Sequence, residues 1–148
     1  MQLVFTKGSG KYDRMEVMRA NGLVERIDCP KQRIIPHDMV HYVVESVLAK
    51  RGFVTRVRDG ERADMRMRGE AESDGVERLV EVIQGDAWSG GGSEAAEMLD
   101  LYRVTCDARD CPVLGVTASD VDAVRARMAE LTAQWEALPV GQSLALSM

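Results

Sequence analysis

The sequence predicts one α+β domain, in which a small, mostly antiparallel sheet with an N-terminal hairpin is covered by about four helices. Apolar residues alternate with polar ones near both ends of the chain, whereas between them they recur every three or four residues, as in helices. The 148 residues have the length of one ordinary domain, and 45% hydrophobic with 29% charged residues is typical of globular proteins. We therefore expect residues 1–148 to fold around one core.

The chain is expected to begin with a strand and a hairpin. Leu3 and Phe5 alternate with polar neighbours and predict the first strand. An Asn-Gly pair predicts the hairpin turn, and a three-residue loop with Gly22 in the left-handed conformation pairs Met15 with Ile27. The same register sets opposite charges against each other across the strands, at Glu16 with Arg26 and at Arg14 with Asp28.

Both histidines of the chain lie on the next predicted element, an amphipathic helix. Pro36 suits its first position, where a missing N–H is no loss, and Asp38 in the first turn meets the positive end of the helix dipole. Gly52 is expected to end the helix. Its buried stripe has the spacing of a helix face and comprises Val40, Val43, Val44, Val47 and Leu48.

A strand and a second helix are expected in the middle of the chain. The segment 53–58 predicts a strand, whereas the charged segment 61–73 has no clear pattern and its structure is left open. A helix is expected from about residue 75 to 84, with Asp74 and Glu77 as a candidate capping pair.

Two more helices and a closing strand complete the prediction. Ser93 is expected to cap a helix that continues through Tyr102. Ser119 with Asp122 resembles a capping box at the start of the last helix, which Pro139 ends. A half-buried closing strand is predicted by the alternation of small residues with Leu144, Leu146 and Met148.

His37 and His41 are candidate metal ligands, because residues four apart on a helix direct their side chains to the same point. The spacing is that of His-Glu-x-x-His zinc peptidase helices, but Asp38, which is one methylene shorter, holds the place of the glutamate base. Glu45 is a candidate ligand or a carboxylate that orients His41. Because a catalytic zinc needs a third protein ligand, further candidates are Glu77, Glu81, Glu94, Glu97, Asp107 and Asp110.

The sequence leaves three functions open. The first is a small protein with a site for zinc or another divalent metal on the HDxxH helix. The second is a non-catalytic module whose histidines are structural and whose surface binds a partner or a second copy. The third is an unusual zinc-dependent hydrolase with Asp38 as its base. Metal content separates the second function from the other two.

Charge and cysteine content indicate where the protein is expected to work. A net charge of -5 argues against nucleic acid as a partner. The chain has three cysteines, and an odd number without a disulfide framework suits a reducing compartment. No signal peptide or bilayer-spanning apolar stretch is evident. We expect a cytoplasmic protein without a membrane partner, whose closing strand can pair with a second copy in a homodimer.

Two segments resemble a group of small uncharacterised bacterial proteins. Residues 36–45 read Pro-His-Asp-Met-Val-His-Tyr-Val-Val-Glu, and residues 135–144 follow the pattern Trp-x-x-Leu-Pro-Val-Gly-Gln-Ser-Leu. The group shares a helix of the same His-Asp-x-x-His type and a closing Leu-Pro-x-Gly segment. The resemblance implies similarity over most of the chain, but it implies no reaction and no ligand, because no activity is established for the group.

Overall fold

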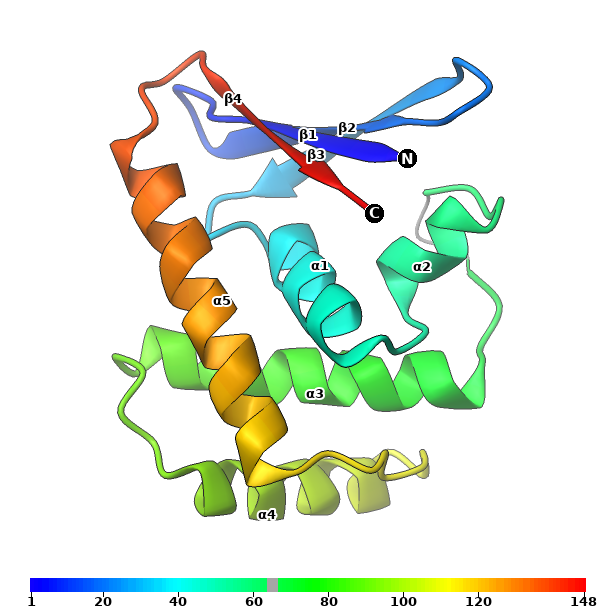
Figure 1. The fold of residues 1–148 in the computed structure, drawn as a ribbon, viewed down its shortest axis with the longest axis vertical. Coiled ribbons are helices and arrows are strands. Elements are labelled where there is room, and N and C mark those ends of the chain that lie inside the picture. Colours follow the sequence, from blue (N-terminus) through cyan, green and yellow to red (C-terminus); the bar gives the residue numbers. More distant parts are fainter. Residues whose placement is uncertain (64–66) are drawn as a thin grey trace.

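A computed structural model describes residues 1–63 and 67–148, and these residues form one four-stranded antiparallel sheet and five helices (Figure 1). The strands are β1 (Gln2–Thr6), β2 (Tyr12–Met18), β3 (Val24–Pro30) and β4 (Ser143–Ser147). The helices are α1 (His37–Leu48), α2 (Phe53–Arg58), α3 (Ala71–Trp88), α4 (Ala95–Ala108) and α5 (Ala118–Ala137). The predicted α+β class with an N-terminal hairpin is confirmed.

The sheet has the strand order β3-β2-β1-β4 and the predicted hairpin register. Met15 pairs with Ile27, and Gly22 has a positive φ of 84° in the three-residue loop. The opposite charges lie across the strands as expected, at Glu16 with Arg26 and Arg14 with Asp28. The closing strand β4 pairs with β1, so that Leu146 lies beside Leu3 on the buried face.

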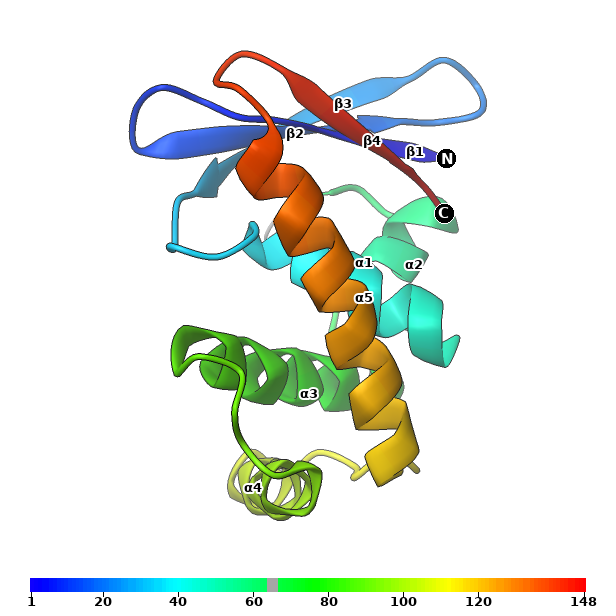
Figure 2. The same cartoon turned by 60° about the vertical axis from the view of Figure 1, so that its left-hand side comes forward.

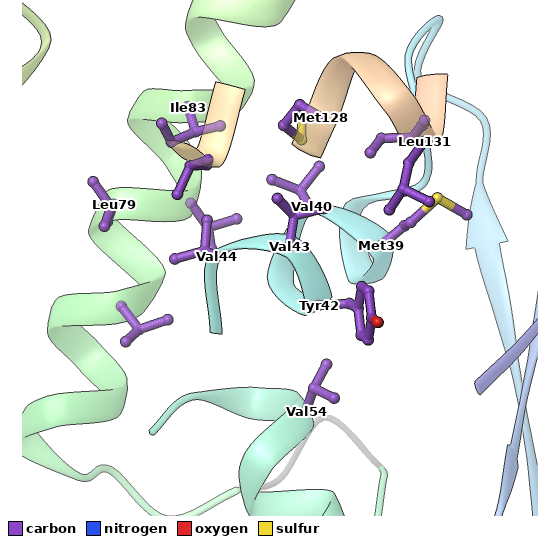
Figure 3. Close-up of a cluster of buried hydrophobic side chains, with 14 of the residues drawn as sticks. Met39, Val40, Tyr42, Val43, Val44, Val54, Leu79, Ile83, Met128 and Leu131 are labelled. Carbon is purple, nitrogen blue, oxygen red and sulfur yellow. The ribbon is translucent and has the colours of Figure 1, made fainter. Parts of the chain in front are cut away.

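The helices lie in layers on one side of the sheet, with α1 directly beneath it (Figures 1 and 2). α1 contacts α2, α3 and α5, while α4 lies on the far side of α3. Apolar side chains from α1, α2, α3 and α5 converge around α1 (Figure 3). Residues 39–45 of α1 are consecutively buried. The predicted apolar stripe is therefore too narrow, because this helix has neighbours on nearly all sides.

The strand predicted at residues 53–58 is wrong, since these residues form the short helix α2. Val54 and Val57 are both buried, and their spacing of three residues places them on the same face of the helix. The backbone N–H groups at the start of α2 donate to the carboxylate of Glu45. If these residues formed a strand, the carboxylate would lose these donors.

Several predicted helix ends also differ from the observed ones. α1 ends at Leu48, with Ala49 in the left-handed conformation, and not at Gly52. α3 begins at Ala71, four residues before the predicted start, and Asp74 lies inside its first turn.

The N-cap of α4 is Glu94 and not Ser93. A capping box does open α5, but it is formed by Thr117 and Asp120, two residues before the predicted pair Ser119 and Asp122.

Within the described ranges, no helix is both long and apolar enough to cross a membrane.

Candidate metal centre

The two histidines of α1 face one carboxylate of α3. His41 Nε2 lies 2.7 Å from Glu77 Oε2, and His37 Nε2 lies 3.6 Å from Glu77 Oε1. The imidazole rings meet edge to face, with their centroids 4.9 Å apart. One ligand atom from each of the three side chains lies within 4.8 Å of the other two. The group therefore offers two imidazole nitrogens and one carboxylate that lie close enough together to hold one metal ion.

The other ring nitrogens bond to acceptors, and this sets the tautomers. His37 Nδ1 lies 3.0 Å from Gln84 Oε1, which also accepts from the Gln32 amide at 3.0 Å. His41 Nδ1 lies 3.1 Å from Glu45 Oε2. Because these oxygens accept, both Nδ1 atoms carry a hydrogen. In the neutral form of either ring, the Nε2 lone pair is then directed at Glu77.

Glu45 connects His41 to the start of α2. Its carboxylate accepts the backbone N–H groups of Gly52 at 3.1 Å, Val54 at 3.1 Å and Thr55 at 2.8 Å. Gly52 permits this approach, since a Cβ at that position would lie 2.7 Å from Glu45 Cδ. The carboxylate thus fixes both the His41 ring and the first turn of α2.

The site is buried at His41 and partly exposed at His37 and Glu77. The side chain of His41 is 3% exposed, whereas His37 and Glu77 are 39% and 34% exposed. Burial lowers the pKa of His41, but hydrogen bonds to Glu45 and Glu77 outweigh it and raise the pKa to about 9. Burial opposes ionisation of Glu77, yet both histidines hold its pKa well below the usual range. A hydrogen bond to Glu77 also raises the pKa of His37. Without a metal ion, the group therefore favours protonated histidines paired with an ionised Glu77.

Asp38, predicted as the catalytic base, lies beside the site but outside the group of three ligands. Its Oδ2 accepts from the Cys29 thiol of β3 at 3.7 Å. Burial raises the pKa of Asp38, and the nearby histidines oppose that shift. Burial and Asp38 together raise the pKa of Cys29 to about 12, so the thiol keeps its proton.

Among the acidic residues that the sequence offered as a third ligand, the structure brings Glu77 to the histidines. The group of His37, His41 and Glu77 does not include Glu45, whose oxygens bond to His41 Nδ1 and to backbone N–H groups. The remaining candidates, which are also outside the group, are Glu81, Glu94, Glu97, Asp107 and Asp110.

Gln84, the partner of His37, was not predicted from the sequence. Its signal is present in the chain, since Gln84 lies seven residues after Glu77, two helical turns along the same face of α3. The spacing becomes informative only after Glu77 is known to face α1.

Two imidazoles and one carboxylate form a donor set that zinc and other divalent transition metals use in proteins. The residues present therefore fit a metal ion. Comparison of the chain with protein-family models, curated proteins and solved structures gave no match. The resemblance to small bacterial proteins stays a prediction, and the case for a function rests on the geometry of this site.

Proposed function

We propose that this protein binds a divalent transition-metal ion, with zinc as the first candidate, through Nε2 of His37, Nε2 of His41 and the carboxylate of Glu77. The observation that carries the proposal is the pair of Nδ1 hydrogen bonds. Histidines that bind metals usually donate the other ring N–H to a carboxylate or carbonyl, which fixes the ring and the tautomer. Here Gln84 and Glu45 are those acceptors.

A purely structural role accounts for less of this arrangement. A buried ion pair between His41 and its two carboxylates needs no second histidine. Yet His37 is half-exposed and has its own Nδ1 acceptor, and its Nε2 faces the same carboxylate. A shared ligand explains why both rings are oriented in this way.

Three protein ligands are also the number found in catalytic zinc sites, where a further position stays open. Because His37 and Glu77 are partly exposed, a water molecule or a substrate could occupy this open position. An ion held in this way supplies Lewis acidity. Hydrolysis is therefore the second candidate function, and Asp38 would be its base, as the sequence suggested.

Calorimetric titration of the purified, metal-free protein with zinc, and separately with manganese, tests the proposal. We expect one ion per chain for the wild type. The variants His37→Ala and Glu77→Gln each remove one ligand, and we expect them to lose most of the affinity while keeping the fold.

Glu81→Gln is the matched control for Glu77→Gln, because Glu81 lies one turn further along α3 and pairs with Arg78 instead. It should bind zinc like the wild type. Unchanged stoichiometry and affinity in His37→Ala would overturn the proposal, and circular dichroism of each variant separates loss of a ligand from loss of the fold.

A further inference from the structure

The end of α4 brings two cysteines side by side. Arg109 is the C-cap of the helix, and Asp110 follows in the left-handed conformation with φ 51°. The N–H of Cys111 donates to Cys106 O at 3.1 Å, and the N–H of Asp110 donates to Asp107 O at 3.3 Å. These two bonds define a Schellman motif, whose first and last residues are Cys106 and Cys111. The side chains of the two cysteines are close enough to hydrogen-bond to each other.

The chain beyond Cys111 is also held in place. The N–H of Leu114 donates to the Tyr102 hydroxyl at 3.2 Å, and this hydroxyl donates to Gly75 O of α3 at 2.9 Å. Gly75 allows the segment to approach closely, because a Cβ there would lie 2.8 Å from Pro112 O. Cys111 therefore lies between two fixed points and does not move freely relative to Cys106.

The two thiols differ in access. Cys106 is fully buried, whereas Cys111 is partly exposed. Burial and the neighbouring Cys111 thiol raise the pKa of Cys106 to about 11. Cys29, the third cysteine, is buried on β3 and contacts Asp38. A reagent in solution thus meets Cys111 first, and Cys106 is the thiol next to it.

We infer that Cys106 and Cys111 form a reversible intramolecular disulfide when the protein meets a low-molecular-weight disulfide such as oxidised glutathione. The Cys111 thiolate attacks one sulfur of the oxidant, the S–S bond of the oxidant breaks, and one thiolate leaves. Cys106 Sγ then attacks Cys111 Sγ, the S–S bond to glutathione breaks, and the proton of Cys106 leaves with the departing glutathione as its thiol. Two cysteines are oxidised, and one molecule of oxidant is reduced to two thiols.

The bond would join the last turn of α4 to the segment that packs on α3. Because the Schellman motif already holds both residues together, we expect oxidation to leave the fold intact.

Thiol titration and peptide mapping of the folded protein after treatment with oxidised glutathione test the inference. We expect the free thiols to fall from three to one per chain, with a Cys106–Cys111 cross-link that dithiothreitol removes. Cys29→Ser should give the same cross-link. Cys106→Ser should instead accumulate glutathione on Cys111, and Cys111→Ser should leave Cys106 unmodified.

Substitution of Asp110 tests the role of the turn. Asp110→Gly keeps the left-handed conformation and should form the cross-link like the wild type. Asp110→Val strains that conformation, and the ratio of cross-link to mixed disulfide should fall roughly tenfold. Wild-type protein that accumulates the mixed disulfide at Cys111 while Cys106 stays reduced would overturn the inference, as would a cross-link formed only in denaturant.

Discussion

At the scale of single residues, Glu45 combines a buried carboxylate with hydrogen bonds to two helices. Its carboxylate is buried and accepts from three backbone N–H groups and from His41 Nδ1. Glu45→Gln keeps the shape of the side chain but replaces one acceptor oxygen by an NH₂ group, which faces other donors. We expect the free energy of unfolding to fall by about 3–5 kcal/mol, the usual effect of breaking a buried, paired charge.

Urea unfolding measures this loss. Glu81→Gln is again the control, since this partly exposed residue makes a surface pair with Arg78 and should change stability by less than about 1 kcal/mol. Equal effects in the two variants would contradict the importance of the Glu45 hydrogen bonds.

The raised pKa of His41 predicts how the metal-free protein responds to pH. Its folded pKa of about 9 lies above the ordinary value of 6.5, so this stabilisation is complete below pH 6.5 and is lost as the pH rises through about 9. We expect the free energy of unfolding to decrease by about 3 kcal/mol over that interval. Chemical denaturation in the presence of a chelator measures it. His41→Gln should remove most of the decrease and leave only the smaller part that comes from His37, whose pKa is also raised. An undiminished decrease in this variant would assign it to another group.

The sequence identified the two histidines and included Glu77 among six further carboxylates, but it could not choose between them. The histidine spacing is local, because one helical turn relates His37 to His41. Glu77 and Gln84 reach the site only through the packing of α3 on α1, which no local pattern encodes. The role of Glu45 was half-predicted: the sequence offered it as an orienting partner of His41, but not as the acceptor for the first turn of α2.

Among the secondary-structure elements, α2 shows why local patterns fail. The segment is only six residues long, and its β-branched residues suit a strand as well as a helix. The choice is made by Glu45, a residue on another helix, which accepts the N–H groups at its start. The hairpin, by contrast, was predicted down to its register, because turn length and cross-strand charge are both local.

Gly52 tests the connection between α1 and α2. Gly52→Ala would place a Cβ 2.7 Å from both Glu45 Cδ and Val76 Cγ1, so the first turn of α2 has to move. We expect a loss of about 1–3 kcal/mol, as for other overpacked sites. Gly85→Ala is the control, because no heavy atom beyond its chain neighbours and the nearby backbone of α3 lies within 4 Å of the corresponding Cβ. Thermal unfolding compares the two, and equal melting temperatures would contradict the close approach.

For the molecule as a whole, zinc should behave as a stabilising ligand. An ion that binds only the folded chain, at about 100 times its Kd, stabilises it by about 2.7 kcal/mol. For a chain of this size we expect the melting temperature to rise by roughly 5–10 °C. Differential scanning calorimetry with zinc and with a chelator measures the shift. His37→Ala should show none, and an equal shift in that variant would point to a site elsewhere.

The pairing of β1 with β4 has a consequence for the order of folding. β1 pairs with β2 through a short loop, but it meets β4 only after all the helices have been traversed. Contacts between residues so distant in sequence carry a large loop-closure entropy and form late. Leu146→Ala removes a buried side chain beside Leu3 and should cost about 2–4 kcal/mol. In stopped-flow experiments this loss should appear almost entirely as faster unfolding, with the refolding rate unchanged, because the contacts of β4 with β1 form after the transition state.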